Sequence, residues 1–332
     1  LKSQGGLFQI TDRTYGNVPQ QFQTEIDALF NSLETEVNAN LPTSTAATYL
    51  TGISNSAALA NSANGVDYSS GMQLFMLGVT GGMGADLGGA SMTNAKADNV
   101  AGLAGIASLT LGLRPGMFIK KKIGYFDTER ARIYINWFDR SMSFDTVTMK
   151  TSTLGLHLQY KVLPEQKYGY GSLKWAGVDV TTGFRTSSSS VRFQKSVTET
   201  FTDSIDLPPT VSLTANFAGD VDLGAEYSVN TIPIEVSTAV RFLWVWSLFG
   251  GVGVDFQSGS AKSVATLNGP VSVESSPGLI SGVGATAKLD LGEKSGPKPA
   301  YPRYFLGTQL ELGVVSFFAQ YTAYADNSAI GG

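Results

Sequence analysis

The sequence predicts an all-β protein, a transmembrane antiparallel β-barrel of about 12 strands with an N-terminal helical segment. Three observations predict this class. From about residue 98 onward, long stretches alternate apolar and polar residues with period two. The chain has 38 Gly among 332 residues and is only 15% charged, which suits strands with a lipid-facing side and a polar side. No apolar run reaches the length, about 18 to 20 residues, that a membrane-spanning helix needs.

The alternation assigns each face of a strand, because successive side chains point to opposite sides of a sheet. Leu154 and Leu156 point one way, and His157 lies on the other face. The stretches 220–228 and 232–246 repeat the pattern, with charged residues on their polar faces. In a membrane barrel the apolar face meets lipid and the polar face lines the lumen. A soluble two-sheet protein is the competing interpretation.

Residues 1–68 differ from the rest and predict a helical plug or appendage. Apolar side chains recur there at helical spacing, with acidic residues between them. The predicted plug residues are Phe22, Glu25, Ile26, Phe30, Leu33 and Glu34. A second, alanine-rich helix is expected over 46–63. We expect the acidic helix to lie in or over the lumen and to meet Arg130, Arg132 or Arg241, so that it plugs or gates a pathway. The alternative is a periplasmic or external appendage with a purely structural or binding role.

Residues 69–332 form the predicted barrel. Turn-forming residues separate fifteen candidate strands, near 71–80, 99–112, 116–126, 130–139, 150–163, 168–184, 190–203, 209–217, 220–228, 232–246, 249–257, 263–274, 278–291, 303–312 and 314–324. Bacterial barrels normally use an even strand number, so we predict about 12, with 10 to 14 allowed. Tyr and Trp often fall near the ends of these strands, as expected of an aromatic girdle at headgroup level.

The polar faces of the candidate strands carry charges of both signs. The predicted lumen-facing residues are Arg130, Arg132, His157, Asp179, Glu235, Arg241, Asp255, Lys288, Asp290 and Glu311. A mixed set is expected either of a water-filled pore with opposed charges or of a filled barrel with internal ion pairs. The residues alone do not separate these two cases.

The inventory of reactive residues argues against an enzyme. His157 is the single histidine and no catalytic motif surrounds it, so we predict a polar lumen residue rather than a general base. The chain has no cysteine and no calcium-loop motif, so no metal is expected. The glycine-rich run 81–89 lacks the spacing of a nucleotide-binding loop, and we predict no cofactor.

Charge and chain ends bear on partners and location. The net charge is -4 and no basic cluster exceeds Lys120 to Lys122, so a nucleic-acid partner is not expected. Leu1 follows no leader peptide, so we expect a mature product whose export signal has been removed. The predicted partner is outer-membrane lipid, with a small solute as a further candidate, and the predicted location is the bacterial outer membrane. The oligomeric state is left open.

In pattern the chain resembles bacterial outer-membrane β-barrels, through the dyad strands of residues 69–332. The helical segment that directly precedes these strands resembles the hatch of the fatty-acid transporter (FadL-like) family. The resemblance implies a barrel with an N-terminal plug. The Asn-Pro-Ala motif of that family does not occur in residues 1–68, and no functional residue is transferred from it.

Two functions follow as hypotheses from different classes. The first is a plugged or gated channel for small, possibly hydrophobic, solutes. The second is a non-conducting barrel that serves as an adhesion, interaction or envelope-scaffolding protein. A barrel-embedded hydrolase that uses His157 is the weakest hypothesis, because no catalytic motif surrounds that residue.

Overall fold

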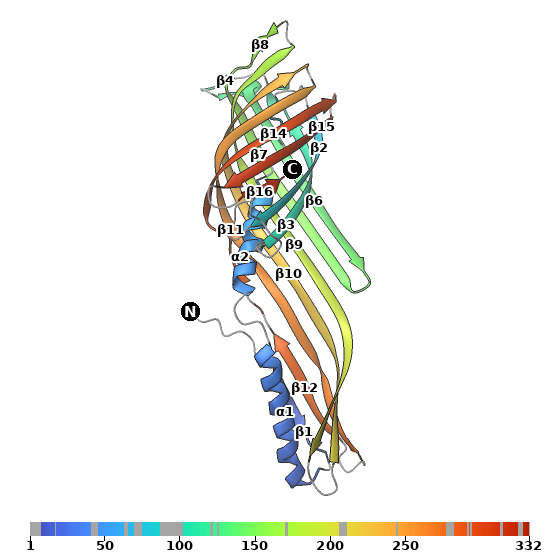
Figure 1. The fold of residues 1–332 in the computed structure, drawn as a ribbon. Helices are drawn as coiled ribbons and strands as arrows, with labels where there is room; N and C mark the ends of the chain where they lie inside the picture. The colour runs from blue at the N-terminus through green and yellow to red at the C-terminus, as the bar shows by residue number, and fades with distance from the viewer. Residues whose placement is uncertain are drawn as a thin grey trace.

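The molecule is elongated, with a wide end built from most of the strands and a narrow end built from fewer strands and one helix (Figure 1). The computed structural model describes residues 8–16, 18–40, 46–62, 66–69, 75–86, 102–119, 122–124, 126–169, 172–205, 211–243, 245–276, 282–290, 292, 294–312, 315–324 and 328–331. Its elements are β1 (Gln9–Thr14), α1 (Gln20–Asn40), α2 (Ala46–Ala60), β2 (Phe75–Asp86), β3 (Gly102–Leu113), η3 (Pro115–Met117), β4 (Lys122–Ile123), β5 (Phe126–Asp127), η4 (Thr128–Arg130), β6 (Ala131–Phe144), β7 (Val147–Leu163), β8 (Gln166–Tyr168), β9 (Leu173–Ile205), β10 (Val211–Phe242), β11 (Trp246–Ser276), β12 (Val283–Asp290), β13 (Lys294–Ser295), β14 (Ala300–Leu312), β15 (Val315–Tyr324) and β16 (Ser328–Gly331).

One large sheet of 14 strands contains nearly all of these strands, in the order β1-β12-β11-β10-β9-β7-β6-β3-β2-β15-β14 with β8, β13 and β16 attached. All neighbours except β2 and β15, which meet in parallel, pair antiparallel, which confirms the predicted antiparallel all-β class. The two predicted helices are present as α1 and α2. β14 also pairs with β11, so the sheet curves back toward itself. The edge between β2 and β15 is joined at one position only, Val315 with Leu77. The described residues therefore do not form a fully closed barrel.

Three strands are much longer than the sequence predicts, because candidate strands merge. β9 has 33 residues, β10 has 32 and β11 has 31. The gap between the candidate strands 168–184 and 190–203 lies inside β9, where its residues pair on both sides with β7 and β10. The serine-rich stretch 187–190 resembles a loop in composition, yet hydroxyl side chains are compatible with paired strands. The merged strands run the length of the molecule and connect its two ends (Figure 1).

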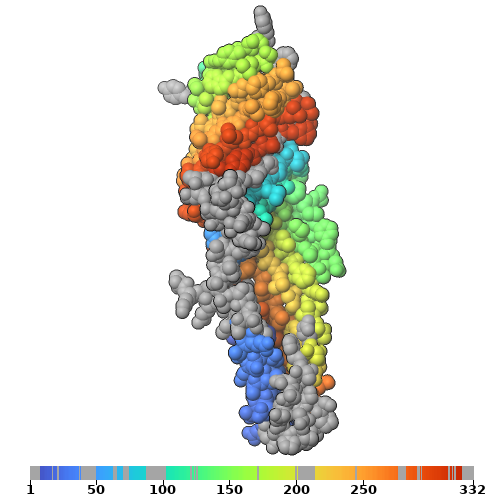
Figure 2. All heavy atoms as spheres, viewed as in Figure 1, coloured from blue at the N-terminus to red at the C-terminus, as the bar shows by residue number. Residues whose placement is uncertain are grey.

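We call the two ends the curved sheet and the extension. The curved sheet comprises β2, β3, β6, β7, β14 and β15 with the adjoining parts of β9, β10 and β11. The extension comprises β1, β12, α1 and the remaining parts of β9, β10 and β11. Figure 2 shows α1, in blue, at the narrow end beside the yellow and orange strands. No helix in the described part of the chain has both the length and the apolar character needed to cross a bilayer.

α1 covers one face of the extension with its apolar side. Ile26 and Phe30 are buried in a cluster with Phe217 of β10 and Val271 and Val273 of β11. The helix begins directly after Pro19, a residue that is tolerated before a first turn because it lacks the N–H that would stay unbonded there. Burial of side chains of this size contributes about 2 kcal/mol each. This packing fixes α1 on the extension.

Hydrogen bonds and ion pairs tie α1 to β1. Arg13 pairs with Asp27 at 2.9 Å and with Glu34 at 3.2 Å, and the Ile10 N–H donates to Glu34 at 2.6 Å. The hydrogen bond from the Tyr15 hydroxyl, together with Arg13, lowers the pKa of Asp27. The basic partner of α1 is therefore Arg13 of β1. This strand is absent from the candidate strands that the sequence predicts.

The polarity of the two sheet faces reverses along a single strand. In β10, Ile232, Ile234 and Val236 are exposed on one face, and the opposite face carries buried Glu235 and Thr231. Toward the extension the first face becomes polar, with Asp220, Asp222 and Glu226, and the second becomes apolar, with Ala215 and Phe217 buried under α1. Pairing with β11 keeps one register from Ser212 to Phe242, so no inserted residue causes the reversal. The sequence alone reverses the two faces.

Candidate functional site: the helix-filled interior of the curved sheet

The inner face of the curved sheet surrounds α2. Every α2 side chain from Ile53 to Ala60 is buried, as are Leu50 and, just beyond the helix, Asn61 and Ser62. The helix packs against β2 and β3 on one side and against β10 and β11 on the other. Most of these side chains are Ala, Ser or Asn, which are small enough to let a helix approach a sheet closely. The interior is therefore occupied by part of the chain itself.

Two glycines of the β2–β3 hairpin set the distance between the sheet and α2. A Cβ added to Gly84 would lie 2.0 Å from the Ser56 carbonyl oxygen, and one added to Gly102 would lie 2.2 Å from the Gly52 carbonyl carbon. Both contacts are to helix backbone, which cannot rotate aside as a side chain would. A glycine is required at each position because the backbones approach so closely.

Hydrogen bonds join α2 to the wall near this contact. The Ser56 hydroxyl donates to the Gly102 carbonyl at 2.9 Å and accepts from the Asp86 N–H at 2.9 Å. The Asn55 amide donates to the Asp86 carboxylate at 2.8 Å. These groups are buried, so leaving any of them unbonded would cost about 1 to 3 kcal/mol. The bonds specify both the position and the rotation of the helix.

Two residues that directly follow the C-terminal end of α2 form hydrogen bonds with β9, β10 and β11. The Asn61 amide donates to Thr231 of β10 at 3.3 Å, and Arg185 of β9 donates to the Asn61 carbonyl at 3.2 Å. Ser62 bonds to the carboxylate of Asp255 on β11. α2 is thereby attached to both sides of the interior.

Residues 66–69 continue the filling beyond α2. Tyr68 is buried and its ring stacks on Phe249, with centroids 4.2 Å apart. Its hydroxyl donates to Glu235 at 3.2 Å. Asp67 accepts a hydrogen bond from Gln309 at 3.1 Å. This segment therefore contacts β10, β11 and β14 and fills the space between them.

An ion cluster lies beside Tyr68. Arg303 of β14 pairs with Glu235 at 2.7 Å and with Asp255 at 2.9 Å, and none of the three side chains is exposed to solvent. Removing such charges from water is costly and is repaid only by close pairing and further hydrogen bonds. Tyr68 and Ser62 supply those bonds to the two carboxylates. Ser62, Tyr68 and the ion cluster therefore stabilise one another.

Three further ion pairs lie on the inner face. Asp179 contacts Lys161 at 3.0 Å and Arg132 at 3.7 Å, all three largely buried. Arg241 pairs with Glu311 at 3.1 Å, with side chains 14% and 11% exposed. Among the residues that the structure describes, these opposite charges of the inner face pair with one another. The choice between a water-filled pore and a filled barrel stays a prediction.

His157 is fully buried on the inner face of β7. Its ring lies close to Gly183, where an added Cβ would come within 2.7 Å of Nδ1. Neither ring nitrogen has a hydrogen-bond partner among the residues that the structure describes. No group of three His, Asp or Glu residues suited to a metal occurs in the described ranges. That the chain is not an enzyme stays a prediction.

The predicted lumen residues divide into two groups. Arg132, His157, Asp179, Glu235 and Asp255 are buried on the inner face, with Arg241 and Glu311 partly buried beside them. The others lie elsewhere. Arg130 is exposed in η4 near Asp127, Lys288 is exposed in the extension and pairs with Asp12, and Asp290 ends β12, with its side chain outside the described residues.

The predicted plug residues belong to α1, which does not occupy the interior. Ile26 and Phe30 are buried against the extension, with Phe22 and Leu33 packed beside them, while Glu25 is exposed. Glu34 pairs with Arg13, so the structure brings the acidic helix to none of Arg130, Arg132 and Arg241. α1 has a wide apolar stripe that needs an apolar partner, whereas the polar interior suits the small side chains of α2.

Sequence analysis did not single out Arg303, Arg185 and Tyr68 as interior residues. Arg303 alternates with the aromatic residues Tyr301 and Phe305 on the inner face of β14, so its neighbours gave no polar signal. Arg185 was assigned to a loop that is in fact part of β9. The period-two pattern of Thr181, Gly183 and Arg185 could have identified it.

The outer face of the curved sheet carries an apolar belt. Its members are between 36% and 74% exposed and include Leu77, Val79, Leu109, Leu111, Ile135, Trp137, Leu154, Leu156, Leu158, Phe184, Ile232, Ile234, Val236, Leu248, Val252, Val254, Phe256, Leu306, Leu310, Val315 and Phe317. Register aligns them across strands, with Ile135 opposite Leu156, Leu156 opposite Phe184 and Ile232 opposite Phe256. Soluble monomers rarely expose a continuous apolar surface on this scale.

Fold and interior together define a class of protein: a large antiparallel sheet that is apolar outside, polar inside and filled by a helix of its own chain. The Lsa36-like family model matches residues 6–331, and the chain belongs to that family. No curated protein and no solved structure matches the chain. The resemblance to the FadL-like family stays a prediction.

Proposed function

We propose that the chain is a bacterial outer-membrane protein whose curved sheet is a lipid-embedded β-barrel sealed by α2. It acts through the surfaces it presents to water, as a non-conducting adhesion, interaction or envelope-scaffolding protein. The reversal of face polarity along β10 carries the membrane part of the proposal. A face that is apolar only over the curved sheet suits lipid there and water beside the extension. Each half-exposed belt side chain gains on the order of 1 kcal/mol when lipid covers it.

The filled interior favours the non-conducting function over the channel. α2 and residues 66–69 occupy the space, and buried ion pairs join the strands around them. A solute could pass only if α2 left its buried hydrogen bonds and the Gly84 and Gly102 contacts. The extension is the surface that suits an interaction role, because its outer face carries rows of charged and hydroxyl side chains. Arg192 there bridges Asp222 and Glu226, each at 3.1 Å.

A channel gated by α2 is the second candidate, and one observation favours it. Several buried side-chain oxygens on β6, β7 and β9 have no hydrogen-bond partner among the described residues: Asn136 Oδ1, Thr153 Oγ1, Thr181 Oγ1 and Ser187 Oγ. They form a polar surface on the inner face. A hydrated path along this surface would open if α2 moved away from it.

Vesicle flotation and planar-bilayer recording of the full-length protein separate these functions. We expect the protein to float with lipid vesicles and to show no steady conductance across a range of voltages, because the interior is filled. Reproducible opening steps would contradict the sealed barrel and favour the gated channel. Failure to associate with vesicles, together with a monodisperse state in the absence of detergent, would contradict the membrane proposal itself.

A further inference from the structure

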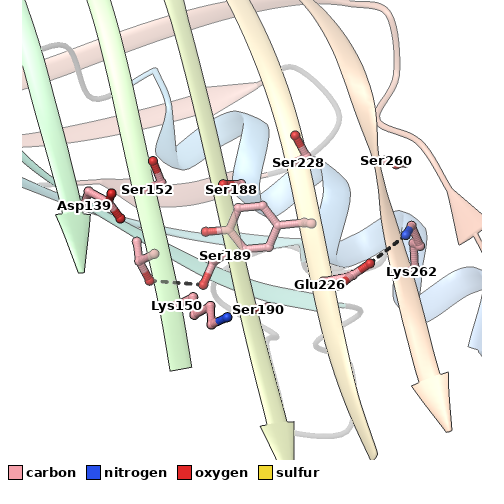
Figure 3. Close-up of a pocket in the computed structure, with 12 residues that line it drawn as sticks. Asp139, Lys150, Ser152, Ser188, Ser189, Ser190, Glu226, Ser228, Ser260 and Lys262 are labelled. Carbon is pink, nitrogen blue, oxygen red and sulfur yellow. Dashed lines mark hydrogen bonds and ion pairs between the residues drawn. The ribbon is translucent and has the colours of Figure 1, made fainter. Parts of the chain in front are cut away.

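A pocket lined by hydroxyl-bearing and charged residues lies immediately beyond the apolar belt, on the outer face where five strands pass from the curved sheet to the extension. Its volume is about 430 Å³ and its lining comes from β6, β7, β9, β10 and β11 (Figure 3). Register brings the lining side chains into rows. Ser152 is opposite Asp139 and Ser188, and Ser228 is opposite Ser188 and Ser260. The next row places Lys150, Ser190, Glu226 and Lys262 side by side.

The position of this pocket is set by the belt. Trp137 of β6 and Leu154 of β7 are belt residues. Asp139 lies two residues after Trp137 and Ser152 two residues before Leu154, on the same outer face. On β10 the change occurs between Ile232 and Ser228. If lipid covers the belt, the pocket lies at the depth of the lipid headgroups, where acyl chains end and polar groups begin.

Some charged side chains of the pocket are already in ion pairs, and others remain open to a ligand. Lys262 pairs with Glu226 at 2.7 Å, and Glu226 also pairs with Arg192. Lys150 and Asp139 are both exposed, and within the described ranges neither forms an ion pair. They lie on adjacent strands, diagonal to each other across the Asp139–Ser152 pair. The pocket thus offers one ammonium group and one carboxylate, a short distance apart, with serine hydroxyls between and beside them.

We propose that this pocket binds the zwitterionic headgroup of a membrane phospholipid, with a phosphate and a primary ammonium group. The Lys150 ammonium and the hydroxyls of Ser188 and Ser190 contact the phosphate, and the Asp139 carboxylate accepts hydrogen bonds from the lipid ammonium. Charge-assisted hydrogen bonds of both signs distinguish this headgroup from an anionic one. The acyl chains of the same lipid lie on the adjacent belt. This inference rests on the proposed membrane location.

Native mass spectrometry of the full-length protein in detergent tests the proposal. Phosphatidylethanolamine, phosphatidylcholine and phosphatidylglycerol are added at equal concentration. We expect phosphatidylethanolamine to be retained about fivefold to tenfold better, because phosphatidylcholine has no ammonium N–H and phosphatidylglycerol has no ammonium. Asp139→Asn should remove this preference, whereas Lys150→Gln should lower the retention of all three lipids, because all three have the phosphate. Equal retention of phosphatidylethanolamine by wild type and both variants would overturn the assignment.

Matched controls isolate the pocket from general charge effects. Lys167→Gln in β8 and Asp145→Asn in the β6–β7 turn make the same chemical changes away from the pocket, and should leave retention unchanged. Loss of the preference in the control variants as well would overturn the assignment to this pocket.

Soluble competitors distinguish a lipid from a free phosphate compound. Glycerophosphoethanolamine and inorganic phosphate should not displace the lipid at equal concentration, because they lack the chains that lie on the belt. Displacement by either would show that the pocket recognises a soluble phosphate and would overturn the lipid assignment. Vesicle flotation separates the two levels of the account. A protein that floats but shows no headgroup preference contradicts this inference alone, whereas one that does not float contradicts the proposed function as well.

Discussion

Gly84→Ala is expected to destabilise the protein by about 2 to 3 kcal/mol and to displace α2 from the interior. The added Cβ would meet the Ser56 carbonyl oxygen at 2.0 Å, so either the helix or the β2–β3 hairpin must move. Movement of the helix breaks the buried bonds of Ser56 to Gly102 and Asp86. Gly102→Ala should act in the same way, through its contact with Gly52. Chemical denaturation in detergent measures the loss of stability.

Gly78→Ala is the matched control for this prediction. Gly78 lies on the same strand and the same inner face, but its nearest neighbour to an added Cβ is Thr110 Cβ, at 3.9 Å. We expect no loss of stability there. An Ala57→Cys background reports α2 directly, since the chain has no cysteine of its own and Ala57 is buried without a side-chain hydrogen bond. Maleimide should label Cys at position 57 slowly in the Gly78→Ala variant and rapidly in the Gly84→Ala variant. Equal, slow labelling in both would show that α2 is not seated on Gly84.

Arg303→Leu is expected to cost about 3 to 5 kcal/mol, because it removes the cation shared by two fully buried carboxylates. Total folding stabilities are commonly about 5 to 15 kcal/mol, so the loss is a large fraction of the total. Neutralising the carboxylates as well, in the Arg303→Leu, Glu235→Gln, Asp255→Asn triple variant, should recover most of the loss. Denaturant titration of the three proteins measures these differences.

Arg192 provides the comparison for Arg303. It also bridges two carboxylates, those of Asp222 and Glu226, but its side chain is 29% exposed on the extension. Water screens such pairs, and Arg192→Leu should cost less than about 1 kcal/mol. Similar losses for Arg303→Leu and Arg192→Leu would mean that the interior of the curved sheet is open to water, contrary to the sealed barrel.

The sequence predicted the strands of the curved sheet well because their two faces differ strongly. On β7, the alternation of Leu154, Leu156 and Leu158 with His157 assigned both faces, and the structure places His157 inside and the leucines outside. The assignment of Glu235 and Asp255 to the interior rests on the same logic. Period-two patterns are reliable where one face is uniformly apolar and the other uniformly polar.

The same logic failed where the environment changes along a strand. Residues 220–228 are apolar at odd positions and residues 232–246 mainly at even ones, and this change of phase was interpreted as a break between two strands. β10 runs through it without interruption. The change marks the point where the face under the helices turns from polar to apolar. A phase reversal without turn residues can therefore indicate a strand that passes between two surroundings.

The choice of the helix that fills the interior could not be made from amphipathicity alone. The first helix has the stronger apolar stripe, and this pattern predicted that it packs in or over the barrel lumen. Its partner proved to be the apolar inner face of the extension, which forms only when β9, β10 and β11 continue as single long strands. The small and polar residues of α2 gave little helical amphipathic signal, although they are what a close contact with Gly84 and Gly102 requires.

The most direct test of the central claim, that lipid surrounds the curved sheet and water surrounds the extension, is spin-label accessibility of the protein in vesicles. Single cysteines are introduced at Leu156 and Ile232 in the belt and at Ser152 and Ser228 beyond it, on the same outer face of the same two strands. The account predicts that labels at 156 and 232 collide mainly with oxygen, which dissolves in lipid, and labels at 152 and 228 mainly with a water-soluble nickel complex. Equal access of the nickel complex to all four sites would contradict it.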